Sequence, residues 1–246
     1  MKIKIACISD THSLHDKWHD KLKYDEFGYE TYSKWKDADI ILHAGDCTSS
    51  GYMHEVKAFL DWFNTLPAPS KIFIAGNHDF FFDTGYKYQR PIPCTDAEEV
   101  NELLKPYQNL TYLNENTTNS FGLNIYGTPI QPWFNNWAFN KMRGDEIQLH
   151  WDKIPSNTDI LIVHGPPYGI LDLIDHKFRK YNESPNVGCE LLLKKIQEVK
   201  PKVVVFGHIH EQYGVIEKDG ITFINASCLN ENYKPINAPQ FIEIEI

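Results

Sequence analysis

Five short segments of the chain carry aspartate, asparagine or histidine directly after a run of branched apolar residues. Residues 9–12 read Ser-Asp-Thr-His, 43–46 His-Ala-Gly-Asp, 76–79 Gly-Asn-His-Asp, 164–167 His-Gly-Pro-Pro and 207–210 Gly-His-Ile-His. Carboxylate, amide and imidazole donors without thiolate suit Mn, Fe, Zn, Ni or Co better than a structural zinc or a calcium site. The sequence therefore predicts a metal site with the ligands Asp10, His12, Asp46, Asn77, His164, His208 and His210.

The number and spacing of these donors indicate two ions. In extended chain, residues i and i+2 point to the same side, so Asp10 with His12, and His208 with His210, are expected to face one site. Seven ligands are too many for one ion and about right for two that share a carboxylate. Enzymes that catalyse in-line attack on phosphorus commonly use two metal ions roughly 3.5–4 Å apart.

Strands and helices must position these donors. Runs rich in isoleucine and valine predict strands over residues 3–9, 40–43, 71–75, 160–163 and 203–206, and amphipathic stretches predict helices over 54–66, 96–105 and 189–199. Thr95 and Glu98 have the spacing of a capping box for the second helix. Strands that alternate with helices imply an α/β layered fold, in which the five segments meet beyond the carboxyl ends of the strands.

The remaining segments extend this α/β pattern. Residues 125–128, 214–217, 222–226 and 241–246 resemble further strands and are expected to form a second, partly antiparallel sheet. No linker or repeat is visible, so we expect a single domain over residues 1–246 with an insertion at about 13–36. The insertion is polar and aromatic with weak periodicity. It could fold over the site as a lid or form the contact of a homodimer.

The composition limits the partners. The chain has 24 basic and 33 acidic residues, a net charge of −9, which argues against a protein that binds nucleic acid through a basic face. No apolar run approaches the roughly 18 residues of a membrane span. The five cysteines are widely spaced and favour a reducing compartment over a disulfide framework. We therefore expect a cytoplasmic protein without a membrane contact or a stable nucleic-acid partner.

The order of the five motifs resembles that of the calcineurin-like metallophosphoesterases, and the stretches 126–129, 137–140 and 206–211 resemble their metallophosphoesterase-domain-containing, class III phosphodiesterase-like subgroup. The resemblance covers residues 10–210 and implies an α/β fold in which a two-sheet β-sandwich is flanked by helices, in four layers. It also implies two metal ions, most often Mn or Fe. One ion would be held by Asp10, His12, Asp46 and His210, and the other by Asp46, Asn77, His164 and His208, with Asp46 as the bridge.

The same resemblance assigns His78 the role of general acid, which protonates the leaving oxygen while a metal-bridging hydroxide attacks phosphorus. Trp133 and Trp137 lie in an aromatic stretch rich in amides that could stack on a nucleobase, although such rings often fill a core instead. The expected substrate is a small phosphodiester such as a nucleotide or cyclic nucleotide. Alternatives with the same fold are a nuclease, a phosphomonoesterase or a non-catalytic metal-binding scaffold.

Overall fold

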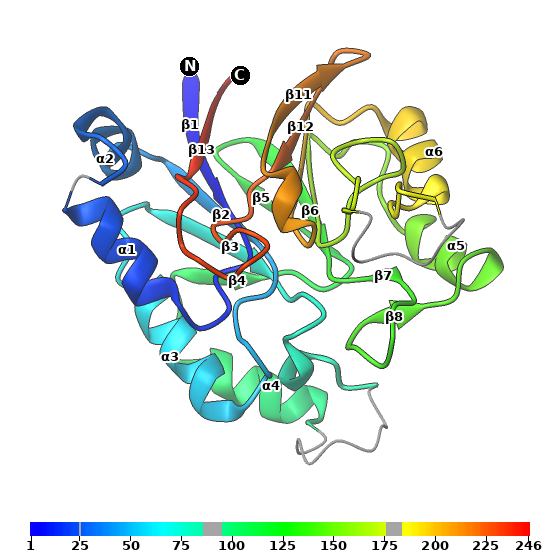
Figure 1. Cartoon of the computed structure of the whole chain (residues 1–246), viewed down its shortest axis with the longest axis horizontal. Helices are drawn as coiled ribbons and strands as arrows, with labels where there is room; N and C mark the ends of the chain where they lie inside the picture. Colours follow the sequence, from blue (N-terminus) through cyan, green and yellow to red (C-terminus); the bar gives the residue numbers. More distant parts are fainter. Residues whose placement is uncertain (25, 86–94, 176–183) are drawn as a thin grey trace.

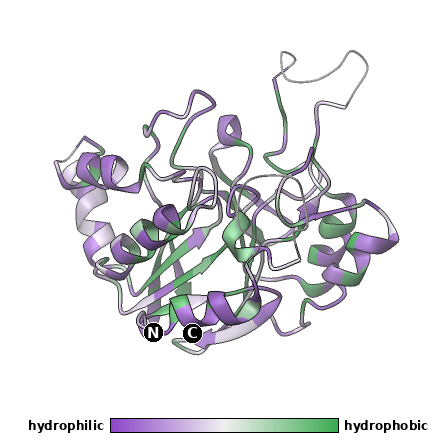
Figure 2. Ribbon diagram, turned by 90° about the horizontal axis from the view of Figure 1, so that it is seen from below, coloured by the Kyte–Doolittle hydropathy of each residue, from purple (hydrophilic) through white to green (hydrophobic). Residues whose placement is uncertain are grey.

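The computed structural model describes residues 1–24, 26–85, 95–175 and 184–246. Two β-sheets face each other in the middle of the molecule, and helices cover their outer faces (Figure 1). The central strands are mostly hydrophobic, whereas the helices alternate hydrophobic and hydrophilic residues (Figure 2). This arrangement confirms the predicted α/β fold, a two-sheet β-sandwich flanked by helices.

The first sheet has five strands in the order β13-β1-β2-β3-β4. These are β1 (Lys2–Ile8), β2 (Ile40–Ala44), β3 (Ser70–Ile74), β4 (Leu110–Tyr112) and β13 (Gln240–Glu245). The strands β1 to β4 are parallel, and β13 pairs with β1 in the antiparallel sense. The prediction that residues 241–246 belong to the second sheet is therefore wrong, because the alternation of a strand does not say which neighbour it pairs with.

The second sheet has six strands in the order β11-β12-β10-β9-β6-β5. These are β5 (Asn116–Ser120), β6 (Leu123–Thr128), β9 (Ile160–Val163), β10 (Val203–Phe206), β11 (Gly214–Lys218) and β12 (Ile221–Asn225). The two edge strands β5 and β11 are antiparallel to their neighbours, and the four inner strands are parallel. The short strands β7 (Gln131–Pro132) and β8 (Asn140–Lys141) form a separate pair.

The apolar core between the sheets explains why the inner strands read as continuous Ile and Val runs. Ile5, Leu42 and Ile72 from the first sheet pack with residues such as Ile162 and Val205 from the second. The alternate residues of the same strands face the helices, so both faces of each inner strand are buried.

Six α-helices form the outer layers. They are α1 (His15–Lys23), α2 (Tyr29–Lys36), α3 (Met53–Asn64), α4 (Ala97–Leu104), α5 (Asp145–Trp151) and α6 (Glu190–Val199) within the described residues. The first four cover the first sheet, and α5 and α6 cover the second (Figure 1). The capping box of α4 lies one residue later than predicted. Asp96 accepts a hydrogen bond from the Glu99 backbone, and Glu99 accepts one from the Asp96 backbone.

The insertion at about 13–36 supplies α1 and α2; residue 25 lies outside the described residues. Trp18 and Trp35 are fully buried in the layer that covers the first sheet, in contact with each other at 5.6 Å between ring centroids. None of the described residues 13–24 and 26–36 lines the cavity above the candidate site, so they do not form a lid over it. The single-domain organisation stays a prediction. No helix among the described residues is long and apolar enough to cross a membrane.

Candidate metal centre

The candidate ligands meet where parallel strands of both sheets end. Asp10, Asp46 and Asn77 follow β1, β2 and β3 of the first sheet, and His164 and His208 follow β9 and β10 of the second. The expected meeting of the five segments beyond the carboxyl ends of the strands is confirmed, and the strands come from both sheets. The donors lie at the seam of the sandwich, where two sets of strand ends converge.

The turns that carry the ligands have left-handed backbone conformations. Asp10, His12, Asp46 and His208 have φ angles of +53°, +40°, +52° and +68°. Asp10 and His12 therefore do not share a strand face, and the extended geometry predicted for them is wrong. Non-glycine residues adopt this conformation at a cost of about 1–2 kcal/mol each, and such positions cluster at functional sites.

Backbone hydrogen bonds continue the ladder between β1 and β2 into these turns. The Asp10 amide donates to the Gly45 carbonyl at 2.9 Å, and the His12 amide donates to the Asp46 carbonyl at 3.0 Å. The two ligand-bearing turns are thus locked to each other by main chain, independently of what their side chains hold.

Glycines let the loops approach closely enough for the donors to meet. A Cβ atom on Gly207 would collide with the Asp10 carboxylate and with the Ser9 hydroxyl. A Cβ atom on Gly76 would collide with Asp46 and would lie 2.7 Å from Cε1 of His164. Any other residue at these two positions must displace a candidate ligand.

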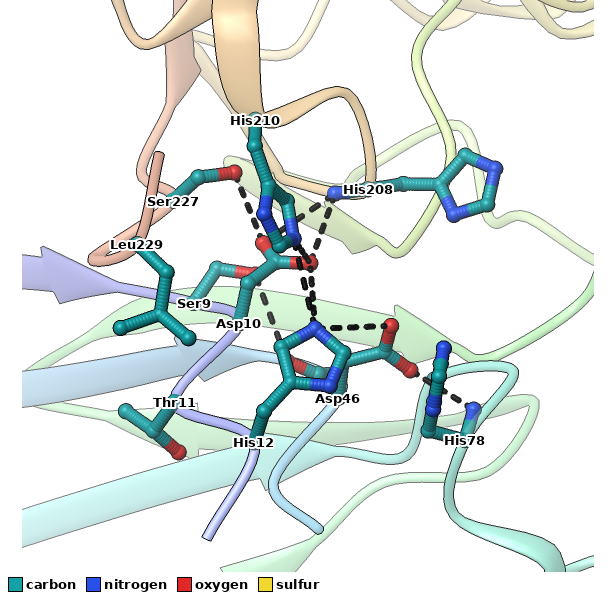
Figure 3. A network of polar contacts seen from close by, with 12 residues as sticks. Ser9, Asp10, Thr11, His12, Asp46, His78, His208, His210, Ser227 and Leu229 are labelled. Atoms are coloured by element: carbon teal, nitrogen blue, oxygen red, sulfur yellow. Dashed lines mark hydrogen bonds and ion pairs between the residues drawn. The ribbon is translucent and has the colours of Figure 1, made fainter. Parts of the chain in front are cut away.

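The first cluster of donors consists of Asp10, His12 and His210, whose ligand atoms all lie within 4.8 Å of one another (Figure 3). Nε2 of His210 lies 3.3 Å from Oδ1 of Asp10 and 3.3 Å from Nε2 of His12. Nδ1 of His210 donates to the Asn230 carbonyl, so its Nε2 atom is the one that faces the cluster. The second carboxylate oxygen of Asp10 accepts a hydrogen bond from the Ser227 hydroxyl at 2.8 Å.

The second cluster consists of Asp46, His164 and His208, again within 4.8 Å of one another. Nε2 of His164 lies 3.3 Å from Oδ2 of Asp46 and 2.9 Å from Oδ1 of Asn77. Nδ1 of His164 donates to the Ala44 carbonyl at 2.9 Å. The same Oδ2 of Asp46 lies 3.6 Å from Nε2 of His12, which places this carboxylate between the two clusters.

Charge and burial at these donors fit a pair of cations. Burial alone would lower the pKa of His164, but the Asp46 carboxylate outweighs it and raises that pKa to about 9. Burial lowers the pKa of His12 and of His208 to about 3. The neutral Nε2 atom of His12 therefore points at a second imidazole and at two carboxylates. A cation among these atoms would replace the proton on His164 and satisfy the facing lone pairs.

His78 lies in the loop that follows β3, and its side chain lines the cavity at the edge of the site. Its Nδ1 atom donates to the Ser49 carbonyl at 2.7 Å, and its amide donates to Oδ1 of Asp46 at 2.8 Å. The imidazole meets the His12 ring edge-on, with 4.5 Å between centroids. This geometry leaves Nε2 as the ring nitrogen available to a molecule in the cavity.

Three residues around the donors were not predicted from the sequence. The buried Asp79 carboxylate accepts hydrogen bonds from the amides of Gly76, Cys47 and Thr48, and so ties the β2 loop to the β3 loop. Its position at the end of the 76–79 motif was a signal that could have identified it. Ser227 and Tyr233 had no such signal. The Tyr233 ring lies 5.0 Å from that of His12 and 5.2 Å from that of His210.

A cavity of about 840 Å³ opens over both clusters. Its wall includes Trp133 and Phe134, which are 54% and 53% exposed, and the half-buried Trp137. Arg143 is the single lysine or arginine among the described residues that line the cavity. Its guanidinium group is already bonded to Glu190 at 2.6 Å and to two backbone carbonyls.

Comparison with known proteins finds a matching family model and several relatives. A family model for calcineurin-like phosphoesterases matches residues 3–212. Metallophosphoesterase domain-containing protein 1 of Homo sapiens is 37% identical over 251 residues, which cover 98% of this chain and 71% of that protein. A UPF0046 protein of Caenorhabditis elegans is 33% identical over 251 residues, which cover 100% of this chain and 82% of that protein.

Solved structures add a likeness of fold. TT1561 of Thermus thermophilus superposes with a TM-score of 0.59 at 12% identity, covering 92% of this chain and 89% of that one. Purple acid phosphatase PPD1 from yellow lupin superposes with a TM-score of 0.50 at 13% identity, covering 99% of this chain and 49% of the phosphatase chain.

Proposed function

This chain belongs to the calcineurin-like phosphoesterase family, and from that premise we propose that it is a two-metal phosphodiesterase for a small nucleotide or cyclic nucleotide. The observation that carries the proposal is the pair of donor clusters at the floor of one cavity, with the Asp46 carboxylate 3.3 Å from His164 in one cluster and 3.6 Å from His12 in the other. A scaffold without chemistry has no need for two adjacent donor sets that open onto the same space.

In this proposal each cluster holds one ion. Asp10, His12 and His210 hold the first, and Asn77, His164 and His208 hold the second, while Asp46 contributes to both. When bound, two such ions polarise the phosphoryl oxygens of an ester and make an attacking water more acidic. The oxygen and imidazole donors suit Mn, Fe, Zn, Ni or Co, and we propose Mn or Fe on the resemblance to the calcineurin-like family. The thiol of Cys47, next to Asp46 in the chain, contacts His43 and the Ile74 carbonyl instead.

His78 acts as the general acid in this proposal. The Ser49 carbonyl accepts the proton on Nδ1, so a second proton on the ring sits on Nε2, which faces the cavity. From there it is transferred to the oxygen that leaves phosphorus. General acid assistance of this kind contributes about 10²–10⁴ in rate.

The cavity wall favours a diester over a monoester. A phosphomonoester brings a second negative charge, and the one guanidinium among the described lining residues is already paired with Glu190. The exposed rings of Trp133 and Phe134 offer a face for a base or another planar group. We therefore propose a substrate with one anionic phosphate and a flat organic substituent. The buried cysteines Cys7, Cys47, Cys189 and Cys228 are all free, which is compatible with the proposed cytoplasmic setting.

A hydrolysis panel on Mn-loaded protein tests this proposal. The panel compares bis-p-nitrophenyl phosphate, p-nitrophenyl phosphate, 2′,3′-cyclic and 3′,5′-cyclic nucleotides and single-stranded DNA, with metal content measured on the same sample. We expect the diesters and a cyclic nucleotide to be hydrolysed fastest. His78→Ala should retain metal and lose activity on esters with poor leaving groups. His54→Ala, which removes an exposed histidine from α3, serves as the matched control.

Other outcomes would replace the proposal. Faster hydrolysis of the monoester would identify a phosphomonoesterase, and cleavage of DNA in preference to the small diesters would identify a nuclease. Protein that binds two ions and hydrolyses none of the esters would be a scaffold.

A further inference from the structure

The indole of Trp137 lies directly against the imidazole of His78. The two ring centroids are 4.2 Å apart and the ring planes are inclined by 31°, which is a close, tilted contact between the ring faces. Trp137 was expected to bind substrate. The face that contacts His78 is not available to a nucleobase while this contact persists.

The main chain holds Trp137 in this position. It lies on the loop between β7 and β8, and the next residue, Ala138, donates its amide hydrogen to the Asn77 carbonyl at 3.1 Å. Phe139 donates its amide hydrogen to Oδ2 of Asp83 at 2.7 Å. The loop is therefore bonded to Asn77, which precedes His78 in the chain, and to Asp83, which follows it by five residues, so the ring contact does not depend on the two rings alone.

Three contacts together fix the orientation of the His78 ring. The Ser49 carbonyl holds Nδ1, the edge-on contact with His12 limits the ring on one side, and Trp137 covers its face. A flip of the ring would break the hydrogen bond to Ser49, and a tilt would separate it from the indole. The remaining nitrogen, Nε2, is then held in one direction.

We infer that Trp137 is a positioning residue, which acts through His78 by holding Nε2 where the leaving oxygen of a phosphodiester needs a proton. The inference rests on the proposed role of His78 as general acid. It predicts that Trp137 matters most when the leaving group is poor, because a good leaving group departs without a proton.

Two substrates that differ only in leaving group test the inference. Thymidine 5′-phenyl phosphate has a poor leaving group and thymidine 5′-p-nitrophenyl phosphate a good one, and both place an aryl ring of similar size in the cavity. In Mn-loaded Trp137→Leu we expect kcat for the phenyl ester to fall about 10- to 100-fold, within the roughly 10²–10⁴ of general acid catalysis. For the nitrophenyl ester we expect a change of less than about threefold, because its chemistry needs little acid. Trp137→Phe, which keeps an aromatic face, should recover most of the loss.

Two further variants show whether the effect passes through His78. In a His78→Ala background, Trp137→Leu should cause no additional loss on the phenyl ester, since residues that act as one unit are not additive. Trp133→Leu removes an indole that lines the cavity and has no ring contact with His78 among the described residues. It should lower the two rates by the same factor and leave their ratio unchanged.

A measurement on metal-free protein is independent of activity. In two-bond ¹H–¹⁵N NMR spectra, His78 in the wild type and in Trp137→Phe should show one ring environment with the proton on Nδ1. In Trp137→Leu we expect this signal to broaden or to average between tautomers.

The outcomes separate the inference from the proposed function. If Trp137→Leu lowers both rates equally, or lowers them further in the His78→Ala background, Trp137 does not act through His78. If His78→Ala itself leaves the ratio of the rates unchanged, His78 is not the acid and the positioning role falls with it. If Mn-loaded wild type hydrolyses neither diester, the proposed function itself is refuted.

Discussion

The insertion at about 13–36 is held to the rest of the fold by a buried histidine that must be neutral. Nδ1 of His19 accepts a hydrogen bond from Nε1 of Trp62 on α3 at 3.1 Å, and the side chain is 8% exposed. Protonation would turn this acceptor into a donor that opposes the indole N–H. Burial accordingly lowers the pKa of His19 to about 4.

The dependence of the unfolding free energy on pH follows from this pKa. An unfolded histidine has a pKa of about 6.5, so between pH 6.5 and 4 the unfolded chain binds more protons than the folded one. The stabilising contribution of neutral His19 is present above pH 6.5 and is lost as the pH falls toward 4. Proton linkage with these two pKa values gives a loss of about 2 kcal/mol between pH 7.5 and pH 5.

The test compares urea unfolding of metal-free wild type and His19→Gln at pH 7.5 and pH 5, followed by circular dichroism. Glutamine retains an acceptor for the Trp62 indole but does not titrate. We expect the wild type to lose about 2 kcal/mol more than the variant over this interval. His54→Gln, which removes an exposed histidine, should keep the wild-type loss. Equal losses in wild type and His19→Gln would refute the structural reasoning.

Three further predictions concern the candidate metal centre. Asp46→Ala removes the carboxylate that lies between the clusters, so bound Mn measured by mass spectrometry should fall from two ions per chain to one or fewer. Gly207→Ala pushes a methyl group onto Asp10 and should cost about 1–3 kcal/mol of unfolding free energy, whereas Gly85→Ala has ordinary space and should cost less than half of that. A gain of stability in Gly207→Ala would contradict the close approach. Because the pKa of His164 is raised to about 9, metal loading at pH 7 should release at least one proton, and calorimetry in buffers of different ionisation enthalpy should detect it. Metal affinity should then rise with pH up to about 9, and an affinity that does not change between pH 6 and pH 8 would contradict the assignment of Nε2 as a donor.

The positions of the donors were predictable because they depend on local signals. A run such as 203–206 is buried on both faces and therefore strongly apolar, so its end is visible in the sequence, and Gly-His-Ile-His follows at once. Which sheet a strand joins is not a local property. The continuous apolar runs before His164 and His208 lie in the second sheet, and the alternating strand β13 lies in the first, but neither pattern specifies the sheet.

The helices of the insertion were not predicted, for a different physical reason. The helix α1 buries His15, Trp18, His19 and Leu22, which have the spacing of one helical face. Two of the four are histidines, which count as polar in a hydrophobic pattern, so the periodicity is hidden. Neutral, hydrogen-bonded or stacked imidazoles behave here as core side chains, with His15 stacked on Trp62 at 4.9 Å.

The left-handed backbone conformation of the turns at the donors could not be predicted from the sequence either. Asp10 and His12 are not glycines, and hydrogen bonds to the β2 loop hold their backbone in that conformation. The positions of Ser227 and Tyr233 depend on how the segment after β12 returns to the first sheet, which no motif in that segment announces.

The hydrogen-bond ladder that runs from β1 and β2 into the ligand turns bears on whether folding depends on metal binding. The turns take their shape from main-chain pairing, so we expect the chain to fold without a bound ion. An ion would then bind to a site that is already formed, unlike in small zinc modules, where the ion is needed to fold. We therefore expect a bound ion to be removed by a chelator, and replaced by another, without unfolding of the chain.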